Sequence, residues 1–362
     1  MTAMRVVLAT GIYPPEIGGP ATYVRELAGV LRAKGITVKI VAYGESAPDD
    51  QKDHVMRVSR KGNTLSRYIR YARALREVCD GCDIVEAFSS VSVGVPLWMA
   101  HLRGPKKVLR LGGDFLWERA TDKGDPRGLR EWYDGKKGRV GFMNGLLRTF
   151  DTIVFSTAFQ EELYRRFYAN LPPVTVIENV SPAGHPALHA LHDPVKLLSL
   201  GRFVAFKNLP ALIGAMSLLP NARLTFVGSG PEETKLRRMV VSHAVSDRVT
   251  FLPPAHGGEK KALFGEHDLL VIPSKTEISP NAALEARAAG LPVLLTEETG
   301  LSRTLLDGMT IAKMQTSEDV ARAIEDVVAK YPAHAARAAQ PLKERTWQTV
   351  ADEHLSLFSS LL

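Results

Sequence analysis

The stretch that decides the fold of this 362-residue chain is LLVIPSKTEISPNAALEARAAGLPVLLTE, residues 269–297. Two short apolar runs, 269–274 and 292–297, flank a polar turn and a helical segment. Apolar runs that do not alternate with polar residues are typical of strands buried on both faces of a parallel sheet. Ser279 and Pro280 favour a helix start, as the N-cap and the first helical residue. The stretch therefore predicts strand, loop, helix and strand, the repeating unit of an α/β fold.

The same alternation of apolar runs and helical patterns fills the rest of the chain. The clearest helix places Val24, Leu27, Ala28 and Leu31 on one face and stops at Gly35. The further apolar runs are 5–10, 38–43, 83–88, 107–111, 152–156 and 174–178 in the first half, and 196–201, 223–228 and 249–253 in the second. Such alternation predicts doubly wound parallel sheets with helices on both faces.

The length of the chain predicts two domains, because one ordinary core does not accommodate 362 residues. The segment NVSPAGHPALHALHDP, residues 179–194, has three prolines and three histidines without clear periodicity. We expect it to be the linker, with one domain over 1–185 and the other over 190–345. The last thirty residues are helical by pattern, but the pattern alone does not assign them to a domain.

Composition limits the class of protein. Charged residues are 23% and hydrophobic residues 45%, as in soluble globular proteins. No apolar run is long enough to span a membrane, the N-terminus reads as a strand from Met4 rather than a signal peptide, and there are only two cysteines. We therefore expect a cytoplasmic protein.

The positive charge is unevenly distributed along the chain. Residues 1–190 contain 27 Lys and Arg against 20 Asp and Glu, whereas residues 191–362 contain 19 of each. This asymmetry favours an anionic partner for the first half, such as a phospholipid surface or an acidic acceptor. Charge that serves only solubility explains it equally well. Nucleic acid is excluded as a partner, because no basic run is interleaved with aromatic residues.

Ligands of doubly wound sheets bind at the carboxyl ends of strands, so the loops after the strands are candidate sites. Gly18 and Gly19 follow the first strand, where glycines allow backbone amides to approach a phosphate. A tight turn without a ligand explains the glycine pair equally well. Arg202 and Lys207 follow the strand at 196–201 and suit a diphosphate, Arg as a fork and Lys as a point charge.

Glu277 and Glu285 bracket the start of the helix predicted at Pro280. One acid lies ahead of the helix and the other in its second turn, so a ligand laid across the helix start would meet both. Carboxylates accept hydrogen bonds from sugar hydroxyls, while helix amides attract phosphate. In the alternative, Glu277 only supports the helix dipole and Glu285 pairs with Arg287 or another neighbour.

Several motifs, taken in their order, resemble one known family. They are YPPEIGGPATYVRELAGVLRAKG (13–35), LGRFVAFKN (200–208), FVGSGPEE (226–233) and VIPSKTEISPNAALEARAAGLPVLLTEETG (271–300). Along nearly its whole length the chain is similar to the GT-B retaining glycosyltransferases of family four. The resemblance implies two Rossmann-like domains that face each other across a cleft, an N-terminal acceptor domain that includes the C-terminal helix 345–362, and a C-terminal donor domain.

The resemblance implies transfer of a hexose-type sugar from a nucleotide-diphosphate-sugar to a lipid-linked or saccharide acceptor, in cell-envelope or polysaccharide biosynthesis. It implies no cofactor and no metal. Arg202 and Lys207 would stabilise the leaving diphosphate, Glu277 would contact the sugar hydroxyls and Glu285 the ribose. The other implied donor-binding residues are Gly18, Gly19, the backbone around Pro253, Ser229, Gly230, and Ser279, Asn281 and Ala282 at the helix start.

Two positions depart from the family pattern. Where many members have Glu-x-Phe-Gly, this chain has Glu-Ile-Ser-Pro-Asn at 277–281, and Pro280 removes one amide donor. Where many have a histidine after the strand at 107–111, this chain has Asp114 within GGDFLWE. We expect Asp114 to bind a sugar hydroxyl or deprotonate the acceptor. A structural turn is the alternative reading of Gly-Gly-Asp.

Other signals carry less weight. Cys79 and Cys82 have the spacing of a zinc knuckle, but a structural zinc site needs four ligands and no second pair exists. The helix expected at 65–78 carries Arg67, Arg70 and Arg73, which fits either a solvated face or an anionic membrane at the inner face of the cell. Two alternative functions remain, a catalytically silent nucleotide-sugar-binding protein and a nucleotide-sugar epimerase on the same fold.

Overall fold

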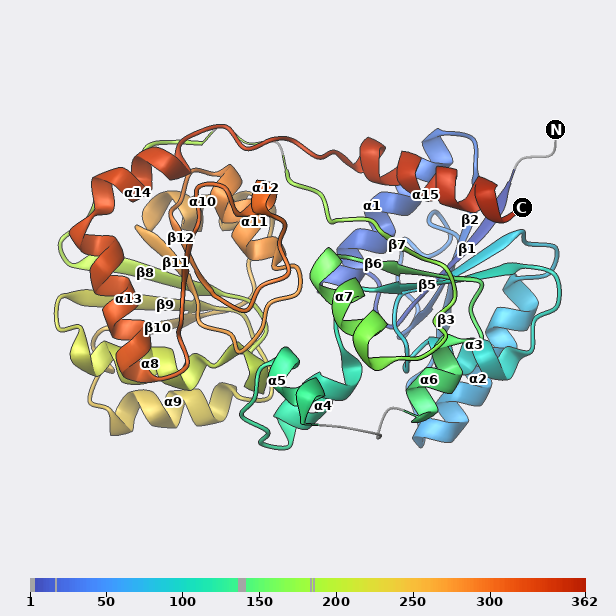
Figure 1. Cartoon of the computed structure of the whole chain (residues 1–362), viewed down its shortest axis with the longest axis horizontal. Helices are drawn as coiled ribbons and strands as arrows, with labels where there is room; N and C mark the ends of the chain where they lie inside the picture. The colour runs from blue at the N-terminus through green and yellow to red at the C-terminus, as the bar shows by residue number, and fades with distance from the viewer. Residues whose placement is uncertain (1–3, 17, 136–140, 183, 185) are drawn as a thin grey trace. The chain divides into compact units, whose positions relative to one another are not determined.

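The computed structural model describes residues 4–16, 18–135, 141–182, 184 and 186–362 (Figure 1). The chain divides into two compact units. Unit 1 comprises Met1–Phe115, Tyr133–Val180 and Thr346–Leu362, and unit 2 comprises Leu116–Trp132 and Ser181–Arg345. Within the part of the chain that is described, no helix is both long and apolar enough to cross a membrane.

Unit 1 is built on a seven-stranded sheet in the order β3-β2-β1-β4-β5-β6-β7, with every neighbouring pair parallel. The strands are β1 (Arg5–Thr10), β2 (Thr37–Tyr43), β3 (Val55–Val58), β4 (Ile84–Ala87), β5 (Lys106–Leu111), β6 (Thr152–Phe155) and β7 (Val174–Val176). The helices are α1 (Gly19–Ala33), α2 (Thr64–Val78), α3 (Gly94–Ala100), α6 (Gly141–Leu147), α7 (Ala158–Phe167) and α15 (Trp347–Leu361). The helices α4 (Phe115–Asp122) and α5 (Leu129–Asp134) extend over the boundaries of the two units.

Unit 2 has a six-stranded parallel sheet in the order β10-β9-β8-β11-β12-β13. The strands are β8 (Val195–Leu200), β9 (Ala222–Val227), β10 (Val249–Leu252), β11 (Leu269–Ile272), β12 (Val293–Thr296) and β13 (Thr310–Ala312). The helical segments are η1 (Ala205–Lys207), α8 (Leu209–Leu218), α9 (Glu233–Ser242), α10 (Gly257–Glu266), α11 (Asn281–Ala288), α12 (Arg303–Leu306), α13 (Ser317–Ala329) and α14 (Tyr331–Ala338).

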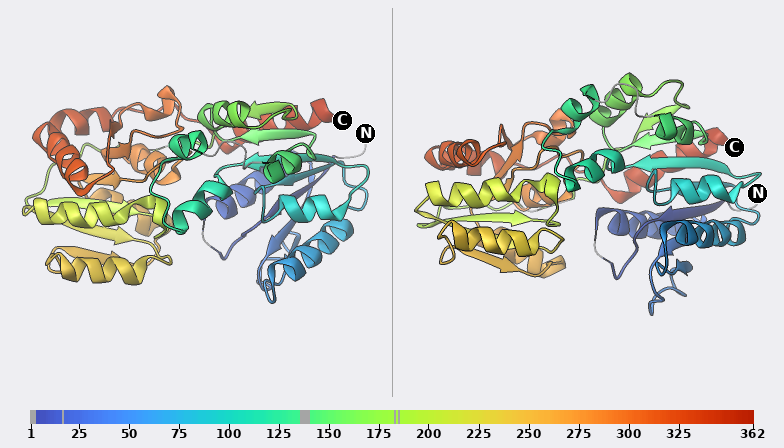
Figure 2. Two further views of the ribbon diagram at one scale, coloured as in Figure 1. Left: turned by 60° about the horizontal axis from the view of Figure 1, so that its bottom comes forward. Right: turned by 90° about the horizontal axis from the view of Figure 1, so that it is seen from below.

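Figure 2 shows helices on both sides of the unit 2 strands. Apolar side chains form a buried core cluster on each face of this sheet. One face packs Leu212 of α8 and Val320 of α13 against the sheet, and the other packs Leu284 of α11. In unit 1, Leu27 of α1 and Phe358 of α15 pack in the same core cluster as the strands. Burial on both faces explains why the strand sequences do not alternate, and the predicted α/β class with two doubly wound parallel sheets is confirmed.

Details of the predicted elements differ from the structure. The short edge strands β3 and β13 were not predicted, because neither is a continuous apolar run. The helix α1 begins at Gly19, one residue before Pro20, although proline is typical of the first helical position. The predicted N-cap Ser279 is wrong: Pro280 holds that position with an extended backbone, and α11 begins at Asn281 without a side-chain cap. Because the backbone of Pro280 is extended, with ψ 98°, it cannot be the first helical residue and takes the N-cap position instead.

The segment Leu116–Trp132, called the excursion below, was expected in the first domain but groups with unit 2. Its Trp117 is buried and lies 5.3 Å, centroid to centroid, from the ring of Phe206. Strand patterns do not reveal such an assignment, because the excursion belongs to neither sheet. The linker residues described within 179–194 contain no helix or strand. The larger segment of unit 2 begins at Ser181 rather than near residue 190.

The C-terminal helix α15 belongs to unit 1 and covers a buried acidic side chain there. Glu86 in β4 and His354 in α15 are both fully buried, and His354 Nε2 lies 3.2 Å from Glu86 Oε1. His354 Nδ1 lies 2.9 Å from the Val350 carbonyl oxygen, which orients the ring. Because a buried carboxylate without a partner is costly, this pair fixes α15 on the sheet.

We predict that His354→Ala lowers the free energy of unfolding of unit 1 by about 3 kcal/mol, since it leaves Glu86 buried without this partner. The measurement is the urea midpoint followed by far-UV circular dichroism. Ser356→Ala, an exposed change on the same helix, is the matched control. Equal midpoints for the two variants would contradict the prediction.

Candidate active site

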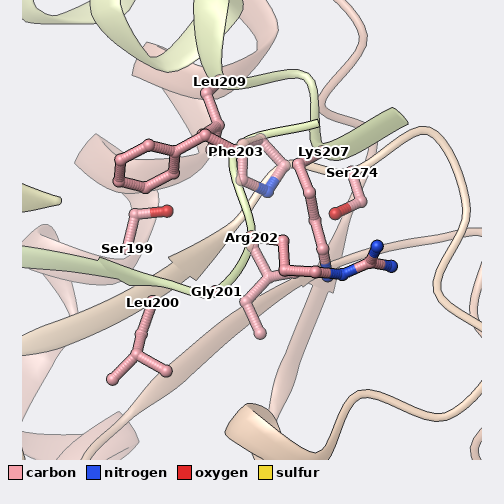
Figure 3. Close-up of a pocket in the computed structure, with 10 residues that line it drawn as sticks. Ser199, Leu200, Gly201, Arg202, Phe203, Lys207, Leu209 and Ser274 are labelled. Carbon is pink, nitrogen blue, oxygen red and sulfur yellow. The ribbon is translucent and has the colours of Figure 1, made fainter. Parts of the chain in front are cut away.

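A pocket in unit 2 opens where β8 and β11 end. Figure 3 shows that Arg202 and Lys207 run to the same side of it. Its lining residues are Ser199, Leu200, Gly201, Arg202, Phe203, Lys207, Leu209, Ile272, Pro273 and Ser274. The pocket therefore joins the loop that follows β8 to the loop that carries Glu277, at the carboxyl edge of a parallel sheet.

Two glycines after β9 allow its loop to lie against the loop after β8. Gly228 has φ +149°, and a Cβ there would lie 1.9 Å from the Gly201 carbonyl oxygen. A Cβ on Gly230 would lie 2.3 Å from the Phe203 carbonyl oxygen. Ser229 accepts a 2.9 Å hydrogen bond at its carbonyl from the amide of Phe203. Ser229 and Gly230 thus shape the backbone that carries Arg202.

The two predicted diphosphate ligands differ in their present contacts. Arg202 is exposed, and within the described residues no carboxylate pairs with its guanidinium. Lys207 closes the short helix η1 and places its Nζ 2.6 Å from Glu277 Oε1. The structure therefore brings Lys207 and Glu277 together, although 70 residues separate them.

Glu277 is held in a buried setting, with 5% of its surface exposed. Its Oε1 accepts hydrogen bonds from Lys207 and from the Ser274 hydroxyl. Its amide donates to the Glu298 carbonyl at 2.9 Å, and its carbonyl accepts from the Gly300 amide at 2.8 Å. Hydrogen bonds therefore hold both the amide and the carbonyl of Glu277, and its carboxylate faces the Lys207 ammonium group.

Glu285 lies in the second turn of α11 and forms an ion pair with Lys260 of α10. Arg287 is not its partner: this fully buried guanidinium donates to the carbonyls of Asp307, Ala338 and Gln340. In the structure, then, each of the two glutamates of residues 269–297 that bracket the helix start is paired with a lysine: Glu277 with Lys207, and Glu285 with Lys260.

The helix α11 starts at Asn281, four positions after Glu277. Its first amides belong to Asn281 and Ala282, while Ser279 precedes the N-cap Pro280. Pro280 offers no N–H, as its residue type requires. Pro253 is exposed beyond the end of β10, and the preceding Leu252 carbonyl accepts from the Gly228 amide at 3.1 Å. These residues stay predicted donor contacts.

The remaining predicted residues belong to unit 1. Gly18 is the N-cap of α1, and Gly19 is its first residue. Asp114 follows β5 and is 1% exposed; its Oδ2 accepts hydrogen bonds from the hydroxyls of Tyr133 at 2.6 Å and Tyr164 at 2.9 Å. Burial, with the Asp114 charge, raises the pKa of both tyrosines well above the usual range. Asp114 is a buried anchor in this structure, and its catalytic role stays a prediction.

Sequence reasoning missed Ser274 and Lys260, which contact the two glutamates. Ser274 directly follows the predicted strand, so its position at a strand end was an available signal. Lys260 gave none, because its contact with Glu285 depends on how α10 and α11 pack. The described residues contain no group of three or more His, Cys, Asp or Glu side chains that could hold a metal ion.

Comparison with known proteins agrees with this geometry. Residues 185–344 match the model of the glycosyl transferases group 1, and residues 18–180 match that of the glycosyl transferase 4-like domain. The D-inositol 3-phosphate glycosyltransferase of Arthrobacter sp. (strain FB24) is 34% identical, over 82% of this chain and 77% of the relative.

Two solved structures share the fold over the whole length. Sucrose-phosphate synthase from Thermosynechococcus elongatus has a TM-score of 0.80 at 19% identity, covering 99% of both chains. HepE from Anabaena, solved with UDP-glucose, has a TM-score of 0.73 at 15% identity, covering 99% of this chain and 100% of HepE. Together with the two-sheet architecture and the matched family models, these likenesses show that this chain belongs to the GT-B glycosyltransferases of family four.

Proposed function

We propose that the protein transfers a hexose-type sugar from a nucleotide-diphosphate-sugar to a lipid-linked or saccharide acceptor, with retention of configuration and without a metal. The observation that carries the proposal is the grouping of Arg202 and Lys207 with Glu277 at adjacent strand ends of unit 2. Two cations suit a diphosphate, and a carboxylate suits sugar hydroxyls. The complex of HepE with UDP-glucose supports a nucleotide-sugar donor.

Each of the two glutamates of the site pairs with a lysine, which suggests how the donor engages them. Lys207 and Glu277 neutralise each other, while Arg202 is exposed. An arriving diphosphate meets Arg202 and then competes with Glu277 for Lys207. Once Lys207 contacts the phosphates, the Glu277 carboxylate accepts hydrogen bonds from sugar hydroxyls instead. Glu285 would likewise exchange Lys260 for the ribose hydroxyls.

In the proposed reaction, the leaving phosphate departs and the acceptor attacks on the same face of the sugar. The bond from the anomeric carbon to the donor phosphate oxygen breaks, and a bond to the acceptor oxygen forms. The acceptor proton passes to the leaving phosphate oxygen, whose charge Arg202 and Lys207 stabilise. A retaining hydrolase would instead use two carboxylates about 5 Å apart, one of them as nucleophile. Here Glu277 is held by two residues that line the pocket, Lys207 and Ser274, an arrangement suited to binding.

The two alternative functions make different demands. An epimerase needs acids and histidines arranged for elimination at the donor, and no histidine lines the pocket described above. A silent binder would keep the cation pair but release no diphosphate from any nucleotide-sugar. Incubation with UDP-, GDP- and ADP-sugars, with and without extracted lipid, separates an enzyme from a binder by diphosphate release.

We propose further that the protein works in the cytoplasm, at the inner face of the membrane. Neighbouring helices of unit 1 expose large apolar side chains: Leu65 and Ile69 on α2, Trp98 on α3 and Phe142 on α6. Arg73 of α2 is exposed too. Apolar and cationic side chains on neighbouring helices are the combination that binds an anionic lipid surface.

We predict that Arg202→Ala and Lys207→Ala each weaken binding of a nucleoside diphosphate about 10- to 100-fold, because each removes a charge-assisted hydrogen bond worth about 1.5–3 kcal/mol. Isothermal titration calorimetry measures the dissociation constants. Arg238→Ala on α9 provides a charge-matched control. Unchanged binding in the double variant would refute the donor-site assignment.

Glu277→Gln should act in opposite directions on binding and turnover. It frees Lys207 from its carboxylate partner, so a nucleoside diphosphate binds at least as tightly as to the wild type. Turnover of the nucleotide-sugar falls about 100-fold, because the sugar loses a charged acceptor. Weaker diphosphate binding, or full turnover, would show that the proposed exchange of partners is wrong.

For the membrane surface, Leu65→Ser combined with Trp98→Ser should weaken binding to phosphatidylserine-containing vesicles about tenfold, through loss of buried apolar area. Vesicle sedimentation measures it, and Val241→Ser, at a 71% exposed position of unit 2, is the control. Binding that ignores the anionic lipid content would contradict this role.

A further inference from the structure

The excursion, which contains α4 and the start of α5 (labelled in Figure 1), contacts the loop that carries Glu277. At its start, Trp117 packs against Phe206, the residue before Lys207. The indole Nε1 donates a 3.0 Å hydrogen bond to the Arg127 carbonyl, which ties the start of the excursion to its end. The excursion is therefore a closed, packed element of unit 2 rather than a loose connection.

Two hydrogen bonds join the excursion to the loop that carries Glu277, and a third joins it to the loop after β12. Lys275 Nζ donates to the Asp125 carbonyl at 2.8 Å. The amide of Leu129 donates to the Thr276 hydroxyl at 2.8 Å, and the amide of Arg130 donates to Glu298 Oε1 at 2.9 Å. Since these two amides open α5, they have no acceptor within that helix, and unit 2 supplies their acceptors.

The two acceptors are themselves linked. The Thr276 hydroxyl donates to Glu298 Oε1 at 2.8 Å, and Thr276 is 1% exposed. Gly128 allows the carboxylate to come this near, because a Cβ there would lie 2.4 Å from Glu298 Oε2. Thr276 and Glu298 thus form a hydrogen-bonded bridge between the excursion and the strand-end loops.

The bridge continues into the backbone of Glu277. Glu277 follows Thr276 in the chain, and its amide donates to the Glu298 carbonyl at 2.9 Å. Thr276, which precedes Glu277 in the chain, and Glu298, whose carbonyl accepts the Glu277 amide, are therefore both residues that the excursion binds. The Lys275 amide also donates to the carbonyl of Phe206, the residue before Lys207, at 2.8 Å.

We propose that Thr276 and Glu298 are positioning residues, and that the excursion is a brace that sets Glu277 for sugar contact. The inference rests on the proposed function for what Glu277 binds, but the brace itself stands on contacts within unit 2. A displacement of about 1 Å at a group that orients substrate is enough to cost about 100-fold in rate. Neither positioning residue has to touch the donor.

The test pairs disruptive variants with conservative ones. Thr276→Val keeps the shape and removes the hydroxyl, and Glu298→Ala removes the acceptor. Thr276→Ser and Glu298→Gln keep the hydrogen-bonding atoms and serve as rescue variants. Glu297→Ala, at the exposed neighbouring position, is the matched control.

We expect Thr276→Val and Glu298→Ala to lower kcat at least tenfold, with the dissociation constant of the nucleoside diphosphate changed less than twofold. The conservative variants should regain kcat to within about threefold of the wild type, and Glu297→Ala should match the wild type. A purely structural role would lower diphosphate binding and melting temperature together with kcat. That pattern, or full activity in both disruptive variants, would overturn the proposal.

Hydrogen–deuterium exchange supplies a readout that does not depend on activity. In Thr276→Val and Glu298→Ala, amides of 116–132 and of 275–300 should lose protection together. Faster exchange in 116–132 alone would overturn the brace. If the wild type released diphosphate from no nucleotide-sugar, the proposed function would fail while the exchange result still decided the brace.

Discussion

The ion pair between Lys207 and Glu277 is the interaction on which the account of the site depends. It joins the ends of β8 and β11, which are neighbours in the unit 2 sheet, with an Nζ to Oε1 distance of 2.6 Å. Both side chains are largely buried, where water is partly excluded, so each charge depends on the other for compensation. A diphosphate that binds Lys207 changes the state of Glu277 as well, which couples recognition of the phosphates to recognition of the sugar.

The backbone around this pair is unusually constrained. Gly228 and Gly230 let the β9 loop lie against the residues that carry Arg202, where any larger side chain would collide with backbone atoms. Thr276 and Glu298 connect the Glu277 loop to the excursion. Preorganised charges of this kind are effective because little reorganisation is needed when the substrate arrives.

Much of the fold could be predicted from the sequence. Strands buried on both faces read as continuous apolar runs, and the unit 2 strands from β8 to β12 lie within a residue or two of such runs. The edge strand β13 was not predicted because its three residues, Thr310–Ala312, do not form a continuous apolar run. The start of α11 was misplaced by one residue, since Ser279 and Pro280 both suit a helix start and only the backbone decides between them.

The site was predictable to a lesser degree. Arg202, Lys207 and Glu277 stood out because they follow strands, and the sheet brings strand ends together. Lys260, Thr276 and Glu298 did not, since their roles arise from packing between segments that are distant in the chain. The placement of the excursion in unit 2 is of the same kind. The sequence shows that Trp117 is a large apolar residue suited to burial, but only the tertiary structure shows that it packs against Phe206.

A crystal structure of the protein with a bound nucleoside diphosphate tests the central claim most directly. The account predicts that Lys207 Nζ lies within hydrogen-bonding distance of a phosphate oxygen, and that the Glu277 carboxylate is separated from it. A structure in which the diphosphate binds while the Lys207–Glu277 pair stays intact would contradict the account.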